Sequence, residues 1–309
     1  MDTSFFAAAI VAGTPLLYAI LGELMTERAG HLNLGVEGMM LMGAVIGFKT
    51  AITTSDPYLS LLSAMAAGGI GALIYAILTI TFRANQIVTG LTLTIFGVGF
   101  ASFMGQGLDG TTVAQNIKLF FGDFKIPLLG DIPVIGQIFF HQGILVYIGY
   151  ILTIIAGIYI YRTQMGLNLR AIGENTVAAD AAGINVLLYK YVHVLLGGIL
   201  CGLGGAYLSL VYIPSWQANA TAGRGWIAIA LVIFCKWNPY LVMGGAFIFG
   251  GLDIIGFRIQ KYEFQISQYI IGLLPYLVTI ILLIIASVRK PKSGAAPANL
   301  GITYFREER

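Results

Sequence analysis

The residues best suited to chemistry are a few polar side chains that interrupt long apolar stretches. Asn33 and Glu37 lie in the segment Gly30–Ala44, where three glycines break up the beginning of an apolar run. A helix that begins this way inside a membrane frees backbone groups, which persist only where they line a cavity or pack against protein. An acid at that depth is a functional-site candidate by default. The alternative is a turn at the membrane surface, in which Glu37 caps the helix or pairs with Arg28.

A second group of polar residues begins a later apolar run. Gln86, Thr89 and Leu93 are spaced i, i+3 and i+7, which places them on one helical stripe, while Thr92 and Phe96 lie one turn apart on another. Polar side chains together with an aromatic ring can line a path for a polar solute that carries a ring. The alternative for each threonine is a hydrogen bond between helices.

Two tryptophans bracket a polar stretch, Trp216–Trp226, that follows Pro214. Tryptophan is enriched at membrane–water interfaces, so the first interpretation is a pair of interfacial anchors. The second is that Trp216 and Trp226 stack on a solute at the outer mouth of a path.

Motifs for catalysis are absent from the sequence. It contains no G-x-x-x-x-G-K-[ST], so the chain hydrolyses no nucleotide through a P-loop, and it contains no H-E-x-x-H or C-x-x-C. His31, His141 and His193 are far apart, and none has a second ligand at helical spacing. We therefore expect no bound metal and no catalytic constellation.

A charged, alanine-rich segment, Gly166–Asn185, lies between two long apolar runs. Asn175 or Thr176 can cap a short helix there, and Gly183 can end it. A chain this apolar retains such a segment where something outside the membrane docks. The helix would present a small-residue face with charges around it, formed by Val177, Ala178, Ala181 and Ala182 and bordered by Arg170, Glu174 and Asp180.

The overall composition excludes a soluble protein. Apolar residues make up 58% of the 309 residues and charged residues only 10%, and the mean hydropathy is +0.85. A soluble domain carries about 25% charged residues, so this chain is an integral membrane protein. The 40 glycines suit closely packed membrane helices. The net charge of +3 gives no indication of a nucleic-acid partner.

A membrane-spanning helix needs about 20 mostly apolar residues. By this criterion the sequence predicts an all-α polytopic bundle of about nine spans, with a range of eight to ten. The seventh candidate is short, and we expect it to be half-spanning or tilted. The candidates are Phe5–Leu24, Val36–Thr53, Leu59–Phe82, Ile87–Gly107, Ile144–Tyr161, Tyr191–Tyr212, Gly225–Trp237, Tyr240–Phe257 and Ile266–Val288.

The distribution of basic residues predicts the orientation. The basic run Arg289–Lys292 indicates a cytoplasmic C-terminus, and nine spans then place the N-terminus outside and residues 163–190 in the cytoplasm. Most of the 17 basic residues fall on the cytoplasmic side in this arrangement. We expect residues 1–288 to form a single transmembrane domain and residues 289–309 a disordered cytoplasmic tail. Residues 108–142 would lie outside, where two similar pieces, Ile126–Gly130 and Ile132–Gly136, would form apolar interfacial turns.

Several segments together resemble the permease subunits of bacterial ABC importers of the simple-sugar and nucleoside type. The resemblance extends from about Thr14 to Val288 and is closest to the nucleoside branch, whose permeases work with a basic membrane lipoprotein-type binding protein. The sequences N-L-G-V-E-G and G-R-G-W-I-A are the most specific to that branch. The segments are Gly30–Ala44, Ala84–Gly90, Gly166–Asn175 with Ala178–Ile184, and Gly223–Ala230 with Trp237–Pro239.

The resemblance implies a type II-like importer permease, multi-pass in the bacterial cytoplasmic membrane. It would form the path for nucleosides with a second, non-identical permease, and an extracytoplasmic lipoprotein would deliver the solute. ATP and Mg would be bound by a separate ATPase with two nucleotide-binding domains, so this chain would hold no cofactor. Residues Thr176–Ala182 would be the coupling helix that contacts this ATPase. The residues implied in coupling are Arg170, Glu174, Asn175, Thr176, Ala178, Asp180 and Gly183.

Three alternatives remain open from the sequence. Ribose, another simple sugar or a branched-chain amino acid is the alternative solute, although Glu37 favours a solute with several hydrogen-bond donors. An ion-coupled secondary transporter would typically use paired acids within the membrane, and here Glu23, Glu27 and Glu37 cluster near one end while Asp253 lies alone elsewhere. An intramembrane enzyme has no nucleophile–base pair in its favour.

Overall fold

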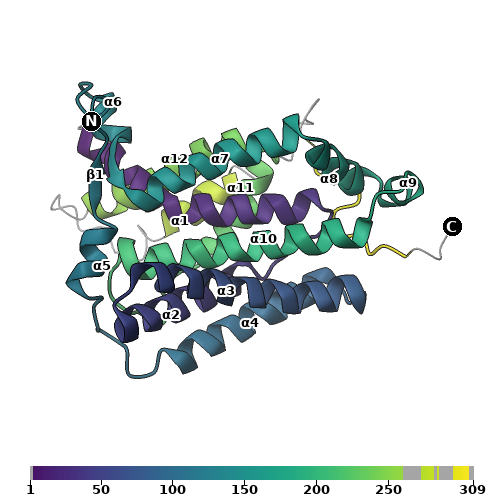
Figure 1. Ribbon diagram of the computed structural model, residues 1–309, viewed down its shortest axis with the longest axis horizontal. Coiled ribbons are helices and arrows are strands. Elements are labelled where there is room, and N and C mark those ends of the chain that lie inside the picture. Colours follow the sequence, from purple (N-terminus) through teal and green to yellow (C-terminus); the bar gives the residue numbers. More distant parts are fainter. Residues whose placement is uncertain (1–2, 260–272, 282–283, 285–294, 306–309) are drawn as a thin grey trace.

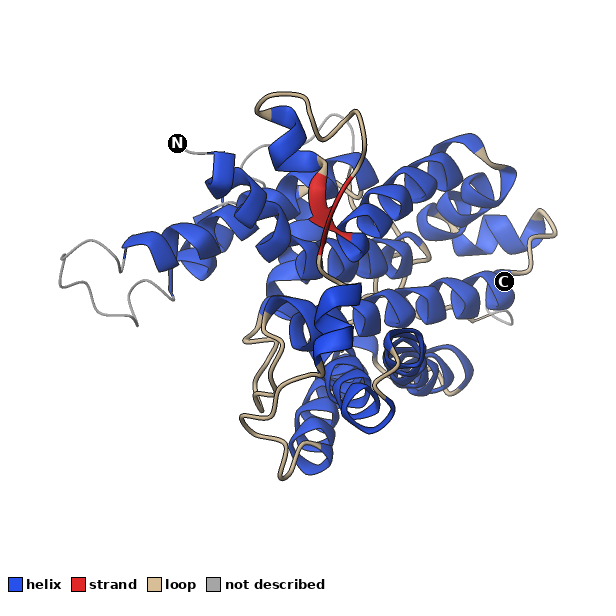
Figure 2. Cartoon of the chain, turned by 60° about the vertical axis from the view of Figure 1, so that its left-hand side comes forward, coloured by secondary structure: helices blue, strands red, loops and turns tan. Residues whose placement is uncertain are grey.

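The structure is a computed structural model that describes residues 3–259, 273–281, 284 and 295–305. Long helices lie side by side along the longest axis of the molecule (Figure 1). Short elements gather at the two ends of this bundle. Most of the described chain is helical, and its strands form one small ribbon (Figure 2).

Four helices form the centre: α1 (Thr3–Arg28), α2 (Val36–Thr54), α3 (Pro57–Ala76) and α10 (Val186–Tyr207). Helix α10 lies against the other three. Their backbones approach closely through glycine, since a Cβ added at Gly43 of α2 would strike the backbone of Gly202 in α10. Small residues supply such contacts in membranes, where lipid tails offer no hydrophobic drive for association.

Three further long helices surround this centre: α4 (Gln86–Met104), α7 (Ile144–Arg162) and α12 (Pro239–Ile259). Helices α4 and α7 are mostly exposed and apolar along their outer faces. Helices α3 and α10 each continue into a π-helical turn, η1 (Ile77–Thr81) and η2 (Leu208–Tyr212).

The predicted spans agree with these helices. Among the described residues, 7 helices are long and apolar enough to cross a membrane, and each coincides with a predicted span. The predicted span Gly225–Trp237 is the short helix α11 (Arg224–Phe234). The predicted span Ile266–Val288 lies largely outside the described residues, of which 273–281 are helical.

The segment 108–142 contains short helices and strands besides the two pieces expected to form turns. Helices α5 (Gln115–Phe120) and α6 (Ile135–Phe139) lie at the end of the bundle where α1 begins (Figure 1). Between them, β1 (Asp123–Lys125) pairs antiparallel with β2 (His141–Gly143). Three residues are too few to give a recognisable alternation of apolar and polar residues, so the sequence could not predict the ribbon.

The opposite end of the bundle carries α8 (Gln164–Glu174) and α9 (Thr176–Ala181), together with residues 295–305 (Figure 1). The expectation of a disordered tail is wrong for residues 295–305. Pro297 is buried, and a tight turn is closed by hydrogen bonds from Leu300 N to Pro297 O and from Ile302 N to Asn299 O. The remaining tail residues, 289–294 and 306–309, lie outside the described residues.

Candidate functional site

Helix α11 begins inside the bundle. The chain leaves η2, reaches the end that carries α5, where Trp216 N donates to Thr111 O at 3.1 Å, and returns as the non-helical segment 213–223. At its other end α11 leads to Trp237, which contacts Arg28 at the end of α1. With 11 residues, α11 is about 16 Å long, roughly half of the ~30 Å hydrocarbon thickness. The helix is therefore as short as the sequence predicted for this segment, for which a half-spanning or a tilted helix was expected.

Helix α2 also begins at depth. The non-helical segment 29–35 follows α1, and the first turn of α2 packs against the middle of α4, where a Cβ added at Gly97 would strike the backbone of Gly38. Thr94 on α4 donates to the carbonyl of Leu34 at 2.8 Å. The helix start at Gly35–Val36 therefore lies inside the protein, with its free backbone groups packed on α4.

Glu37 joins the two helix starts. Its Oε1 accepts hydrogen bonds from Thr221 Oγ1 at 2.5 Å and Gly223 N at 2.9 Å, and its Oε2 accepts one from Gly225 N at 2.6 Å. Glu37 is 4% exposed. A carboxylate placed on the first amides of a helix satisfies unpaired N–H groups and complements the positive end of the helix dipole. Glu37 therefore anchors the start of α11 to α2 in the protein interior.

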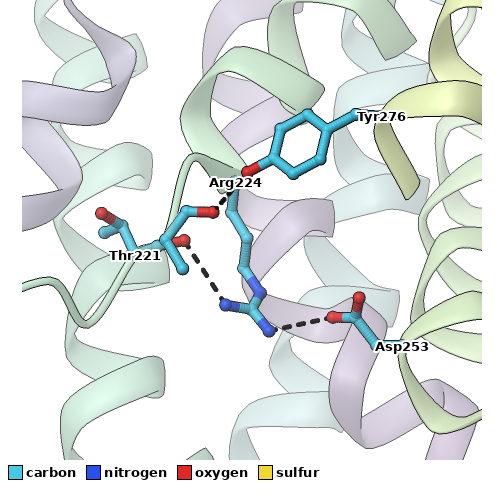
Figure 3. A network of polar contacts seen from close by, with 5 residues as sticks. Thr221, Arg224, Asp253 and Tyr276 are labelled. Atoms are coloured by element: carbon cyan, nitrogen blue, oxygen red, sulfur yellow. Dashed lines mark hydrogen bonds and ion pairs between the residues drawn. The ribbon is translucent and has the colours of Figure 1, made fainter. Parts of the chain in front are cut away.

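A charge pair lies beside this junction, as Figure 3 shows. Arg224, the first residue of α11, donates to Asp253 of α12 at 2.9 Å and to the carbonyl of Thr221 at 3.4 Å. Tyr276 donates to the carbonyl of Ala222 at 2.7 Å. Both charged side chains are mostly buried, with 14% and 19% of their surfaces exposed. The pair therefore ties the start of α11 to the neighbouring long helix.

Two buried acids of α1 bond to two different loops, the loop before α2 and the loop that follows α11. Glu23 Oε1 accepts a hydrogen bond from Asn33 N at 3.0 Å, and Glu27 accepts one from the indole of Trp237. Arg28 donates to the Trp237 carbonyl at 2.8 Å. Glu23 thus holds the backbone of the loop before α2, and Glu27 holds the indole of Trp237 after α11.

The sequence-predicted path residues fall into two groups. In the first, Asn33 and Gln86 support the loop before α2, because Asn33 Oδ1 accepts from Gly35 N at 2.8 Å and Gln86 Oε1 accepts from Leu32 N at 2.9 Å. Together with Glu37, these side chains lie around one loop. The structure brings these three candidates together, and they bond to backbone groups, to the Met39 sulfur and to Thr221.

The second group lines a groove of about 180 Å³ between α3 and α4. Thr89, Thr92 and Phe96 contribute from α4, and Tyr75 from α3. Each threonine hydroxyl donates to a carbonyl four residues earlier in its own helix, at 2.8 Å. The groove therefore offers mostly apolar surface, including the half-exposed ring of Phe96.

The two tryptophans differ in their surroundings. Trp216 is 1% exposed, and its ring packs against Phe48 of α2 at 5.8 Å between centroids. Trp226 is 38% exposed on α11. In this conformation Trp216 faces protein on all sides, and Trp226 retains free surface.

The short helix predicted in the charged segment is present. Asn175 caps α9 by accepting from Ala178 N at 3.0 Å, and Gly183 ends the segment with φ of +84°, a conformation that suits glycine. Thr176 is buried and donates to the Ile172 carbonyl at 2.8 Å. Both the predicted cap and the predicted stop are confirmed.

The predicted small-residue face of α9 is exposed. Val177, Ala178, Ala181 and Ala182 all face outward, while Ala179 is buried on a small apolar cluster with Ile172 and Val186. Around this face, Glu174 is exposed, Asp180 is half-buried, and Arg170 lies 5.8 Å from the ring of Tyr161. A rigid, bonded helix that shows only small side chains outward suits close approach of another protein.

Four residues at this junction were not among the site candidates predicted from the sequence: Arg224, Asp253, Thr221 and Tyr276. A signal for the first two was present, because a charge within an apolar run requires a partner. Nothing in the sequence indicates that these two charges, 29 positions apart, pair with each other.

Comparison with known proteins gives full-length matches. The family described as branched-chain amino acid transport system / permease component matches residues 5–286. A guanosine ABC transporter permease protein of Bacillus subtilis is 35% identical over 94% of both chains. A nucleoside ABC transporter permease protein of Lactococcus lactis is 33% identical over 97% of this chain and 96% of its own. A Haloferax volcanii protein assigned to glucose ABC transport as a permease is 35% identical over 97% of both chains.

A solved ABC transporter structure in an inward-facing conformation, described as of metal-chelate type, also matches. The TM-score is 0.51 at 13% identity, covering 92% of this chain and 84% of that chain. At this identity the likeness concerns the fold alone.

Proposed function

The chain belongs to the branched-chain amino acid transport system / permease component family, and from this premise we propose that it forms the membrane path for nucleosides in an ABC importer. As a family member it is a multi-pass transport component. The observation that carries the nucleoside proposal is the full-length similarity to permeases named for guanosine and for nucleosides. A simple sugar is the second candidate, favoured by an equally similar permease assigned to glucose.

The structure supports a path beside the junction of α2 and α11. Two helices that begin inside the bundle, with backbone groups held by buried side chains, are typical of solute sites near the membrane midplane. Glu37 and the Arg224–Asp253 pair would hold this junction. Phe96 and Thr92 on the exposed face of α4 and Trp226 on α11 would be available to the solute or to a second permease. A purine or pyrimidine ring suits the apolar groove beside Phe96 better than a sugar does.

The energy would come from a partner. We assign α9 as the coupling helix, docked on an ATPase with two nucleotide-binding domains that binds ATP and Mg, and the α8–α9 end of the bundle as cytoplasmic. The opposite end would then receive solute from a binding lipoprotein. The exposed small-residue face of α9 supports this assignment, because a coupling element must transmit contacts that differ between two states.

Uptake by the reconstituted transporter tests the solute. The permease would be placed in liposomes with its second permease, ATPase and binding protein, and uptake of labelled guanosine would be compared with that of glucose. We expect ATP-dependent nucleoside uptake that unlabelled nucleosides abolish and glucose does not. Glucose uptake in its place would establish the second candidate.

A double variant tests the coupling assignment. Arg170→Ala with Glu174→Ala should abolish uptake and the stimulation of ATPase activity while the permease remains folded. The matched control is Lys49→Ala with Asp109→Ala, which removes two exposed charges that lie away from α9. Unimpaired transport by the first variant would contradict the role of the α8–α9 segment.

A further inference from the structure

Residues 295–305 lie across the end of the bundle that carries α9. Asn299 N donates to the carbonyl of Gly173, at the end of α8, at 2.9 Å, and its side-chain Nδ2 donates to Thr176 Oγ1 at 3.2 Å. Two residues later, Gly301 N donates to the carbonyl of Gly30 at 3.1 Å. One tight turn therefore bonds to the α8–α9 junction and to the loop between α1 and α2.

Two aromatic residues later in the same segment, Tyr304 and Phe305, add contacts through their rings. Tyr304 packs on the small cluster that seats α9, formed by the buried side chains of Ile172, Ala179 and Val186. Arg83 follows η1 in the chain, and its guanidinium lies 4.8 Å from the centroid of the Phe305 ring. The segment thus also reaches the connection between α3 and α4.

Gly30 connects these contacts to the junction of α2 and α11. The loop that begins there leads through residues 31–35 to Glu37, whose carboxylate holds the start of α11. A displacement of α9 would therefore be carried through the segment to the loop before α2. That loop bonds both to this segment and, through α2, to the junction of α2 and α11.

We propose that residues 295–305 act as a strap that positions the coupling helix relative to the loop between α1 and α2. This proposal rests on the assignment of α9 as the coupling helix. The strap would make α9, the α1–α2 loop and the start of α4 move as one body, so that motion of the ATPase reaches the junction of α2 and α11. Without the strap, α9 would move independently of the α1–α2 loop, and ATP would be hydrolysed with less solute transported.

Two variants and one matched control test the strap in the complete transporter. Tyr304→Ala removes the ring from the α9 cluster, and Asn299→Ala removes the bond to Thr176. Ile302→Ala is the control, since Ile302 belongs to the same segment and is 55% exposed.

Hydrogen–deuterium exchange of residues 173–190 would be measured first, without solute. We expect exchange in Tyr304→Ala to rise by about tenfold, the factor that the loss of one modest contact produces in a local opening equilibrium. The ratio of solute transported to ATP hydrolysed would then be measured. It should fall in Tyr304→Ala and Asn299→Ala, and remain at the native value in Ile302→Ala.

The two measurements separate this inference from the proposed function. Unchanged exchange at α9 in Tyr304→Ala, or raised exchange with an unchanged ratio of solute to ATP, would overturn the strap. A native transporter that takes up neither nucleoside nor sugar would overturn the proposed function, while the exchange experiment would still report whether the segment holds α9.

Discussion

The clearest test of the interior junction is Glu37→Gln. Glutamine retains one acceptor oxygen, which can still serve Thr221 and Gly223, but its amide NH₂ would face the N–H of Gly225. Hydrogen bonds to a charged group contribute about 1.5–3 kcal/mol against ~1 for neutral ones, and a buried N–H left unpaired costs about 1–3 kcal/mol. The substitution should therefore lower the free energy of unfolding by roughly 3–5 kcal/mol. For a chain of this size, that corresponds to a midpoint about 5–15 °C lower.

The two cysteines provide the assay. Cys201 and Cys235 are both buried, so a thiol-reactive dye would label them only as the permease opens on heating in detergent. Glu37→Gln and native protein would be heated at the same rate, because unfolding of membrane proteins is often irreversible. Asp109→Asn, at an exposed loop position, is the control and should unfold as the native protein does. A native midpoint in Glu37→Gln would refute the conclusion that this carboxylate anchors α11.

Three other perturbations have defined outcomes. Gly90→Ala on α4 would place a Cβ 2.6 Å from the backbone of the loop before α2 and should cost about 1–3 kcal/mol, whereas Gly99→Ala on the same helix meets nothing within 4 Å and should be neutral or slightly stabilising in the same dye-labelling assay. Arg224→Met should destabilise by about 3 kcal/mol, because it leaves Asp253 uncompensated; adding Asp253→Leu should restore part of the loss in thermal unfolding, and an additive double variant would show that the pair is not coupled. Burial holds the pKa of the His31 imidazole, in the loop between α1 and α2, well below its usual range, so stability should be complete above about pH 6.5 and be lost as the pH falls below it. A midpoint-against-pH series in which His31→Gln shows the same acid loss would exclude this histidine as the cause.

The membrane helices followed directly from the sequence because their physical cause is local. A long apolar run in a chain with few charges satisfies its own backbone only as a helix, so all seven long helices of the described residues coincide with predicted spans. The cap at Asn175 and the stop at Gly183 are local in the same way, since each depends on a few adjacent residues.

The interior junction was not predictable because its bonds join distant residues. The sequence singled out Glu37 but left open whether it faces a cavity or the membrane surface, and the structure places it on the first amides of α11. That partner could not be recognised from the spacing of residues on α2. The strap was missed for a related reason: residues 295–305 have no apolar periodicity, and they dock through backbone hydrogen bonds and two rings, which composition does not reveal.

The separation between Glu37 and its partners constrains the order of assembly. The residues that donate to its carboxylate lie 184–188 positions later in the chain. At about 5–20 residues per second, a nascent chain would hold Glu37 without these donors for roughly 10 to 40 seconds. During this interval the early helices would hold an acid whose partners in the folded protein have not yet been made. The buried carboxylate of Glu37 therefore gains its hydrogen-bond partners only when α11, a late element of the chain, has been made.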